Sequence, residues 1–327
     1  MNKKKLSAIL SIALGGIMLT SCTNPDYKVK FTENWYLDTT YDIQTSAQET
    51  LVYDVNFEPS SNADTENLSV FYGKGVYTTT LKSEYSESHG GNIYRYSTRL
   101  EIPVTFECKA SGEISEKFTD VVTSEVVFTS AMQGLKPISS TKTTESHSPT
   151  TNSSPTKLEN CYTYYNYTLD VNYNNDLTGS AVTTNHLQND EKKTYSFEQA
   201  DDKYSTVDNE QLLLAIRGIS KLESQKFNVF NSSWKKSLLV NLTASSSESE
   251  EFKFKRNGED FTATIKYTPI EIQLGVKNSG SIQKVWVANT TEINNNLYRN
   301  VILYMEMPIY YSYGTLQYKL VQADFIN

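Results

Sequence analysis

"FKFKRNGEDFTATIKYTPIEIQLGV", residues 252–276, carries the pattern that decides the fold. Apolar side chains stand at every second position of its runs, as Phe261 and Ile265 do. A period of two is that of a β-strand with one buried and one solvated face. Between two such runs stands Asn257-Gly258, a pair that tolerates the positive φ angles of a two-residue turn. The stretch therefore predicts a β-hairpin that continues into a further strand.

The same alternation recurs along the rest of the chain. It is found in residues 51–57, 238–242, 270–276, 301–307 and 316–320. The intervening positions are rich in Thr, Lys, Glu and Gln, which is typical of antiparallel sheets, because parallel strands are buried on both faces. From Lys236 to the C-terminus the pattern predicts one meander of six or seven strands.

One helix interrupts the strands at "DNEQLLLAIRGI", residues 208–219. Asp208 is a favoured N-cap residue, and Gln211 stands three positions later, as in a capping box. Gly218 suits the C-terminal end. One apolar stripe is formed by Leu212, Ala215, Ile216 and Ile219. We expect this stripe to pack on a sheet face or to fill the end of a curved sheet.

The N-terminal segment has the parts of a bacterial export signal. Lys3–Lys5 is positively charged, and Leu6–Leu19 is apolar. About 20 apolar residues are needed to span a bilayer core, so this run has the length of a signal-peptide core. Leu19-Thr20-Ser21-Cys22 resembles the lipobox of bacterial lipoproteins. The resemblance implies that cleavage falls between Ser21 and Cys22 and that the Cys22 sulfur carries a diacylglyceryl group.

This lipid would determine where the protein resides. Two acyl chains anchor a protein stably, whereas one holds it only marginally. The mature chain is therefore expected outside the cytoplasm, lipid-anchored to a bacterial membrane of the cell envelope. The alternative is an ordinary secretory signal that ends in an unrelated cysteine.

The chain divides into three parts. Residues 1–21 are the predicted lipoprotein signal peptide, 22–45 an anchor-proximal segment and 46–327 an antiparallel β domain. Within that domain, the Ser/Thr/Pro-rich residues 139–157 are expected to form a flexible loop. Strand patterns occur on both sides of it, so one domain with a long loop and two domains are both open, and one continuous fold is favoured.

From Leu51 onward the chain resembles curved-sheet proteins of bacterial envelopes. These are the periplasmic lipoprotein carriers, the mycobacterial glycolipid-binding lipoproteins and related uncharacterised envelope proteins. The resemblance is carried by "EVVFTSAMQGLKPISSTKTTE" (125–145), "NEQLLLAIRGI" (209–219), "GSIQKVWVANT" (280–290) and "YRNVILYMEMPIYYSYGTLQYKL" (298–320). It implies a mainly β fold: a large curved antiparallel sheet, half-barrel or clam-like, with one or a few short helices. The chain has fewer helical patterns than the carriers, and no residue motif transfers a ligand site to it.

The charge of the chain excludes some partners. It holds 30 Lys and Arg against 38 Asp and Glu, and three of the lysines lie in the signal peptide. An acidic surface is repelled by phosphate backbones, so nucleic acid is not an expected partner.

No catalytic, cofactor or metal site is expected. His89, His147 and His186 are isolated from one another, lack metal-ligand spacing and are predicted to be exposed loop histidines. The nucleophile pattern Ser-x-x-Lys lacks its companion motifs and is explained by a Ser- and Lys-rich composition. It begins at Ser139, Ser154, Ser232, Ser233 and Ser281. The protein is therefore interpreted as non-catalytic.

Two cysteines remain besides Cys22. Cys108 and Cys161 can pair outside the cytoplasm. Such a bridge would contribute about 4 kcal/mol in a chain-entropy treatment. The other interpretation is two buried thiols, which pack as small hydrophobes. Both interpretations stay open at this stage.

The aromatic content favours a binding role. The chain has 23 Tyr and 13 Phe, and five of the tyrosines fall in "CYTYYNYTLDVNY", residues 161–173. The main functional hypothesis is a lipid-anchored protein that binds an apolar or amphipathic ligand, a lipid or glycolipid, on a concave sheet face. The alternative is a surface interaction or structural lipoprotein that recognises protein or glycan through exposed aromatic rings. A third class, an enzyme, has no motif to support it.

Overall fold

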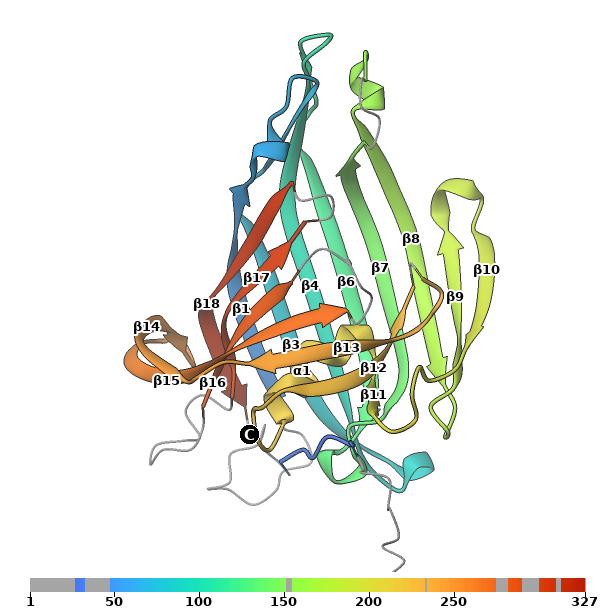
Figure 1. Cartoon of the computed structure of the whole chain (residues 1–327), viewed down its shortest axis with the longest axis vertical. Coiled ribbons are helices and arrows are strands. Elements are labelled where there is room, and N and C mark those ends of the chain that lie inside the picture. The colour runs from blue at the N-terminus through green and yellow to red at the C-terminus, as the bar shows by residue number, and fades with distance from the viewer. Residues whose placement is uncertain are drawn as a thin grey trace, which may run out of the picture.

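A computed structural model describes residues 27–32, 48–150, 155–232, 234–274, 282–289, 300–309 and 313–326. Its eighteen described strands all belong to one sheet, in which most pairs are antiparallel (Figure 1). The predicted fold class, a large and mainly β curved sheet with few short helices, is confirmed. The signal peptide, Ser21 and Cys22 lie outside the described residues.

The first half of the chain supplies the longest strands. They are β1 (Gln48–Pro59), β3 (Gly75–Ser86), β4 (Gly91–Cys108), β6 (Phe118–Thr129), β7 (Pro137–Pro149) and β8 (Tyr162–Tyr173). Shorter strands are β2 (Leu68–Tyr72), β5 (Glu113–Ile114), β9 (Gly179–Asn185), β10 (Glu191–Phe197) and β11 (Ser205–Val207). One-turn helices precede or follow several of them, among them η2 (Glu87–His89), η4 (Leu158–Asn160) and η5 (His186–Gln188).

The second half begins with β12 (Gln225–Asn231). It continues through β13 (Lys236–Ala244), β14 (Glu248–Arg256), β15 (Glu259–Leu274), β16 (Gln283–Ala288), β17 (Ile302–Pro308) and β18 (Gly314–Ile326). The six described strands from Lys236 onward match the predicted number. They are not a simple meander, because β13 pairs with β15 and skips β14.

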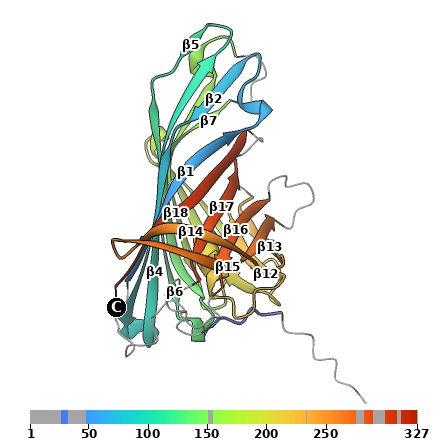
Figure 2. The same ribbon diagram turned by 90° about the vertical axis from the view of Figure 1, so that its left-hand side faces the viewer.

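The strand order explains the curvature. Neighbouring strands run β10-β9-β8-β7-β6-β4-β3-β1-β18-β17-β16-β15-β13-β12-β11. A short parallel pairing of β14 with β18 closes β14 to β18 into a ring of five strands. The long strands of the first half thus stand behind those of the second half, with the helix α1 (Leu212–Gly218) between them (Figures 1 and 2).

The Asn257-Gly258 turn forms as predicted between β14 and β15. Both residues have positive φ, 49° for Asn257 and 83° for Gly258. The side-chain oxygen of Asn257 also accepts a hydrogen bond from the backbone N–H of Phe325 at 2.8 Å. The hairpin is therefore attached to the end of β18 as well as closed on itself.

The predicted helix is present and capped as expected. A one-turn helix, η6 (Asn209–Gln211), leads into α1, and Asp208 and Gln211 form the capping box. The stripe predicted from the sequence is buried throughout, at Leu212, Ala215, Ile216 and Ile219. The helix fills the inside of the curved sheet, where it joins the main hydrophobic core.

The prediction of a flexible loop at 139–157 is wrong for most of its length. Strand β7 runs to Pro149 and pairs with β6 on one side and β8 on the other. Its buried side chains are small and polar, such as Ser140 and Thr144, because this face meets the acidic start of the helix rather than an apolar surface. A strand whose inner face is polar shows no alternation in hydropathy, so its pattern is that of a loop.

Candidate functional site

The chain that follows the predicted anchor is docked on the body. Tyr27 forms a bridge with Tyr204, and Phe31 forms one with Ile219, just after α1. The backbone N–H groups of Thr32 and Ser220 donate to the carbonyls of Gly218 and Lys30 at 2.8 and 2.9 Å. Residues 27–32 are thus joined to the body at the end of α1.

A groove of about 950 Å³ opens beside this segment. Its walls are residues 27–30, the turn after α1, and parts of β12 and β13. Four exposed lysines line it together with a single carboxylate. The lysines are Lys28, Lys30, Lys221 and Lys226, and the carboxylate belongs to Glu223. The surface is locally positive although the chain as a whole carries a formal charge of −8.

Aromatic and apolar groups complete the groove. The rings of Tyr27 and Tyr204 stack at 5.4 Å between centroids. Lys226 Nζ lies 5.7 Å from the centroid of the Tyr204 ring, within cation–π range. Two apolar residues of the lining, Ile219 and Leu242, are at most 5% exposed and belong to the main core. The groove therefore offers cationic heads around a partly apolar surface.

Local contacts hold two of the lysines in place. Lys28 Nζ donates to the backbone carbonyl of Tyr204 at 2.7 Å. Lys221 Nζ lies 2.7 Å from a carboxylate oxygen of Glu223, with 79% of its side chain exposed. Exposed pairs of this kind contribute little to stability, because solvent screens them. The Lys221–Glu223 pair is consequently expected to add little to the stability of the fold.

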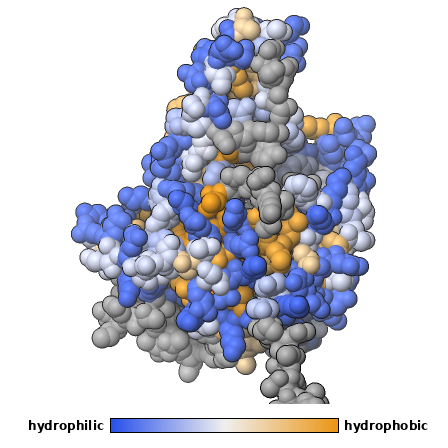
Figure 3. Space-filling model, viewed as in Figure 1, coloured by the Kyte–Doolittle hydropathy of each residue, from blue (hydrophilic) through white to orange (hydrophobic). Residues whose placement is uncertain are grey.

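The concave face was the ligand site expected from the sequence. Within the described residues, α1 occupies its inside, and Leu214, Ala215 and Ile216 are at most 1% exposed. Apolar side chains do reach the surface in the middle of the face seen in Figure 3, bordered by hydrophilic ones.

Two ion pairs fix α1 inside the sheet. Arg217, 2% exposed, donates from both terminal nitrogens to the carboxylate of Glu49 in β1, at 2.6 and 2.8 Å. At the other end, Lys142 Nζ lies 2.9 Å from Glu210 Oε1. The neighbouring Glu210 charge raises the pKa of Lys142. Lys142 belongs to the Ser-x-x-Lys match that begins at Ser139, and its side chain forms this ion pair.

Asp208 connects the same helix to β7 and β8. Its Oδ2 accepts hydrogen bonds from the hydroxyls of Ser140 and Tyr173, both at 2.7 Å. Burial raises the pKa of the Asp208 carboxyl above its usual value, although both hydroxyls oppose this. The sequence identified Asp208 as a cap, and the contacts with β7 and β8 come from the fold.

His147 corrects the prediction that all three histidines are exposed in loops. It lies in β7, where its ring stacks on Phe118 at 4.0 Å and on Tyr164 at 4.8 Å. Its backbone N–H and ring Nδ1 bond to one oxygen of Asp120, at 2.9 and 2.8 Å. Burial raises the pKa of Asp120, while these bonds lower it in part. His147 is a packed strand residue because β7 is a strand.

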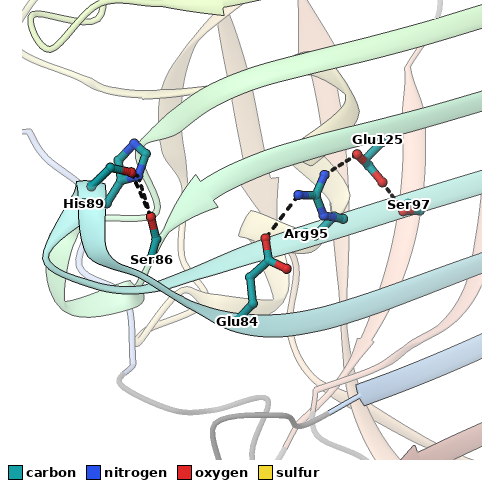
Figure 4. Close-up of polar contacts among 7 residues, drawn as sticks. Glu84, Ser86, His89, Arg95, Ser97 and Glu125 are labelled. Carbon is teal, nitrogen blue, oxygen red and sulfur yellow. Dashed lines mark hydrogen bonds and ion pairs between the residues drawn. The ribbon is translucent and has the colours of Figure 1, made fainter.

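The other two histidines do lie at exposed turns. His186 in η5 bonds to Asp190 at 2.6 Å. His89 in η2 bonds through Nδ1 to the hydroxyl of Ser86 at 2.9 Å (Figure 4). The carboxylates in the same view, Glu84 and Glu125, pair with Arg95 rather than with His89. The histidine, serine and carboxylate therefore do not line up as a nucleophile, base and orienting acid.

Cys108 and Cys161 come together in space. Both are free thiols in this structure and both are fully buried. Each thiol is close enough to shift the pKa of the other. The fold therefore brings together the two sulfurs that the sequence left as candidates for a bridge.

Metal sites and membrane spans were also considered. Within the described parts of the chain, no group of three or more His, Cys, Asp or Glu side chains is arranged to hold a metal ion. Among the same residues, no helix has the length and apolar character needed to span a bilayer.

No family model matches the chain, and no curated protein matches it. Among solved structures, a similar chain is a β-barrel-like protein of the domain of unknown function DUF1849 from Brucella abortus. The two are 9% identical with a TM-score of 0.45, and the match covers 88% of this chain and 100% of the other. A likeness this distant assigns neither site residues nor a function to the present protein.

Proposed function

We propose that the protein is a lipid-anchored, non-catalytic binding protein of a bacterial cell envelope, and that its ligand is an anionic amphiphile. The observation that carries the proposal is the groove, where four exposed lysines and a stacked tyrosine pair line one surface of an acidic chain. Lysine ammonium groups pair with phosphate or carboxylate oxygens. The stacked rings of Tyr27 and Tyr204 offer an apolar face to the rest of the same molecule.

The anchor rests on the N-terminal pattern, with three lysines, an apolar run and Leu19-Thr20-Ser21-Cys22 in register. The docked segment 27–32 supports a link between anchor and groove, because it both follows Cys22 and forms one wall. A ligand bound there would lie next to the membrane that holds the lipid. The site differs from the concave face, where α1 takes the place of a ligand.

The anchor is tested by metabolic labelling with a palmitate analogue. We expect the wild-type chain to incorporate label, and Cys22→Ser to remain unlabelled and either unprocessed or released. An unlabelled wild-type chain would remove the anchor from the proposal.

The ligand is tested in solution on the mature chain with a fluorescent monoalkyl phosphate. We expect Lys30→Gln/Lys226→Gln to raise its Kd about thirtyfold, since each lysine near an anionic group contributes ~1 kcal/mol. The matched control is Lys193→Gln/Lys253→Gln, which removes the same charge from β10 and β14. Equal Kd values for both double variants would show that the groove is not the site. An uncharged alkyl glycol of the same chain length should bind weakly to all of them.

A second candidate function is recognition of protein or glycan through exposed aromatic rings. It is favoured by Tyr164 on β8, whose ring is 37% exposed and stacks on His147 behind it. A ring fixed from behind loses little freedom on binding a sugar face. A glycan array probed with wild type and Tyr164→Ala tests it, and identical profiles would discard the idea.

A further inference from the structure

We propose that Cys108 and Cys161 are joined by a disulfide in the exported protein. Cys108 is the last residue of β4, and Cys161 immediately precedes β8. Both side chains are 0% exposed and belong to the main hydrophobic core. The inference rests on their placement and stands independently of the groove and its ligand.

The two thiols lie in a shared environment. Each thiol is close enough to shift the pKa of the other. Both sulfurs also contact carbonyl oxygens of one short segment: Cys108 Sγ lies 3.7 Å from Pro155 O and Cys161 Sγ 3.6 Å from Lys157 O. Thiols are weak donors, so these contacts give up little when the sulfurs bond covalently.

The surrounding chain already holds the two backbones together. Phe106, two residues before Cys108, stacks on Tyr162, the neighbour of Cys161, with ring centroids 5.0 Å apart. A disulfide needs its two cysteines close and correctly oriented, and it gains least where the backbone must move to meet this demand. The stacked rings supply the closeness before any bond forms.

The closing step needs an oxidant, and we assign this role to the disulfide of an envelope thiol oxidoreductase. One cysteine thiolate attacks a sulfur of that disulfide, which forms a mixed disulfide and releases one oxidant thiolate. The second cysteine then attacks the first, forms the Cys108–Cys161 bond and releases the other oxidant thiolate. Two protons and two electrons leave the protein, and the oxidant ends as a dithiol.

Both sulfurs are inaccessible in the folded chain. The exchange therefore takes place during folding, before the sulfurs reach their contacts with the carbonyls of Pro155 and Lys157.

The test uses the full chain exported by a bacterium with its own leader. Cells are quenched in acid, the protein is denatured and alkylated, and peptides are analysed by mass spectrometry before and after reduction. We expect a peptide with Cys108 linked to one with Cys161, lighter than the two separate peptides by two hydrogen atoms. If both cysteines are alkylated before reduction, or either is linked to Cys22, the proposal is overturned.

A second version separates this test from the lipoprotein proposal. It carries the leader of an unrelated secreted protein and Cys22→Ser. Should this version form the bridge while the native leader fails to export, the anchor is wrong and the disulfide stands. Should both versions be exported with free thiols, the disulfide is wrong whatever the anchor does.

The bridge should also stabilise the region where β4 ends and β8 begins. Reduction is expected to lower the Tm of the oxidised protein by roughly 5–10 °C. The double variant Cys108→Ala/Cys161→Ala should melt near the reduced protein and show no response to reductant. A bridged protein whose Tm does not change on reduction would contradict the stabilising role.

Discussion

Two regions that meet at α1 use charged side chains in opposite ways. Inside the sheet, Arg217 and Glu49 are almost fully buried and bond to each other through both ends of the guanidinium. Just beyond the helix, Lys221 and Lys226 are exposed and line a groove that contains a single carboxylate. A positive side chain is thus buried and paired inside the sheet, whereas those in the groove are solvated.

The difference follows from the cost of taking a charge out of water. A buried charge without a partner is strongly destabilising, so each one inside the sheet has a partner at hydrogen-bond distance. An exposed lysine without an opposite charge nearby costs almost no stability, because water solvates it. The positive field of such lysines attracts anions. The buried pairs therefore determine where α1 sits, while the groove lysines stay in contact with solvent.

The largest effect is expected when one buried partner is removed. Arg217→Met leaves the Glu49 carboxylate buried and unpaired, which should lower the free energy of unfolding by about 3–5 kcal/mol. Urea unfolding followed by circular dichroism measures it. The double variant Glu49→Met/Arg217→Met should recover much of the loss, since it removes both charges. A loss below ~1 kcal/mol in the single variant would mean that the pair does not hold the helix.

An apolar change in the same helix should rank next. Ile216 is 0% exposed in the main core, so Ile216→Ala should cost ~2–4 kcal/mol through lost contacts and a residual cavity. Leu213→Ala is the matched control, because Leu213 is only partly buried. A small cost at Ile216, together with binding of an apolar dye, would instead indicate a loosely filled interior and revive a ligand site on the concave face.

The hairpin between β14 and β15 allows a comparison in which no charged side chain is changed. Gly258 has φ 83°, and a Cβ added there would meet no atom within 4 Å. Gly258→Val should therefore cost roughly 1–2 kcal/mol from backbone strain alone. Gly258→Asn, which tolerates this conformation, should cost clearly less. Equal urea midpoints for Val and wild type would contradict the strain.

The smallest effect on stability is expected in the groove. Lys30→Gln/Lys226→Gln should change the free energy of unfolding by no more than ~0.5 kcal/mol, because both side chains are exposed. The same urea titration measures it, and circular dichroism confirms an unchanged fold. If this variant lost as much stability as Arg217→Met, the lysines would hold the structure and the contrast between the regions would fail.

Local features of the fold could be predicted well. Alternation marked β1, β13, β15 and β18, and the two-residue turn at Asn257-Gly258 forms with the expected φ angles. The capping box at the start of the helix was also visible. Each of these depends on residues a few positions apart, and short-range sterics and hydrogen bonding decide them.

The failures have a common cause. Strand β7 was missed because its inner face is polar, and that polarity makes sense only opposite Asp208 and Glu210. The environment of His147 was missed with it. The groove was also missed, because Lys28 and Lys30 lie far along the chain from Lys221 and Lys226.

What the amino-acid sequence by itself determined is therefore the class of structure, one helix and a tight turn. The tertiary structure decided the rest: that β13 pairs with β15, that Arg217 meets Glu49 across 168 residues, and that scattered lysines converge beside the docked N-terminal segment. The physical reason is range. Backbone preference and side-chain period act between neighbours, whereas partners for distant strands and charges are chosen by how much surface the whole chain can bury at once.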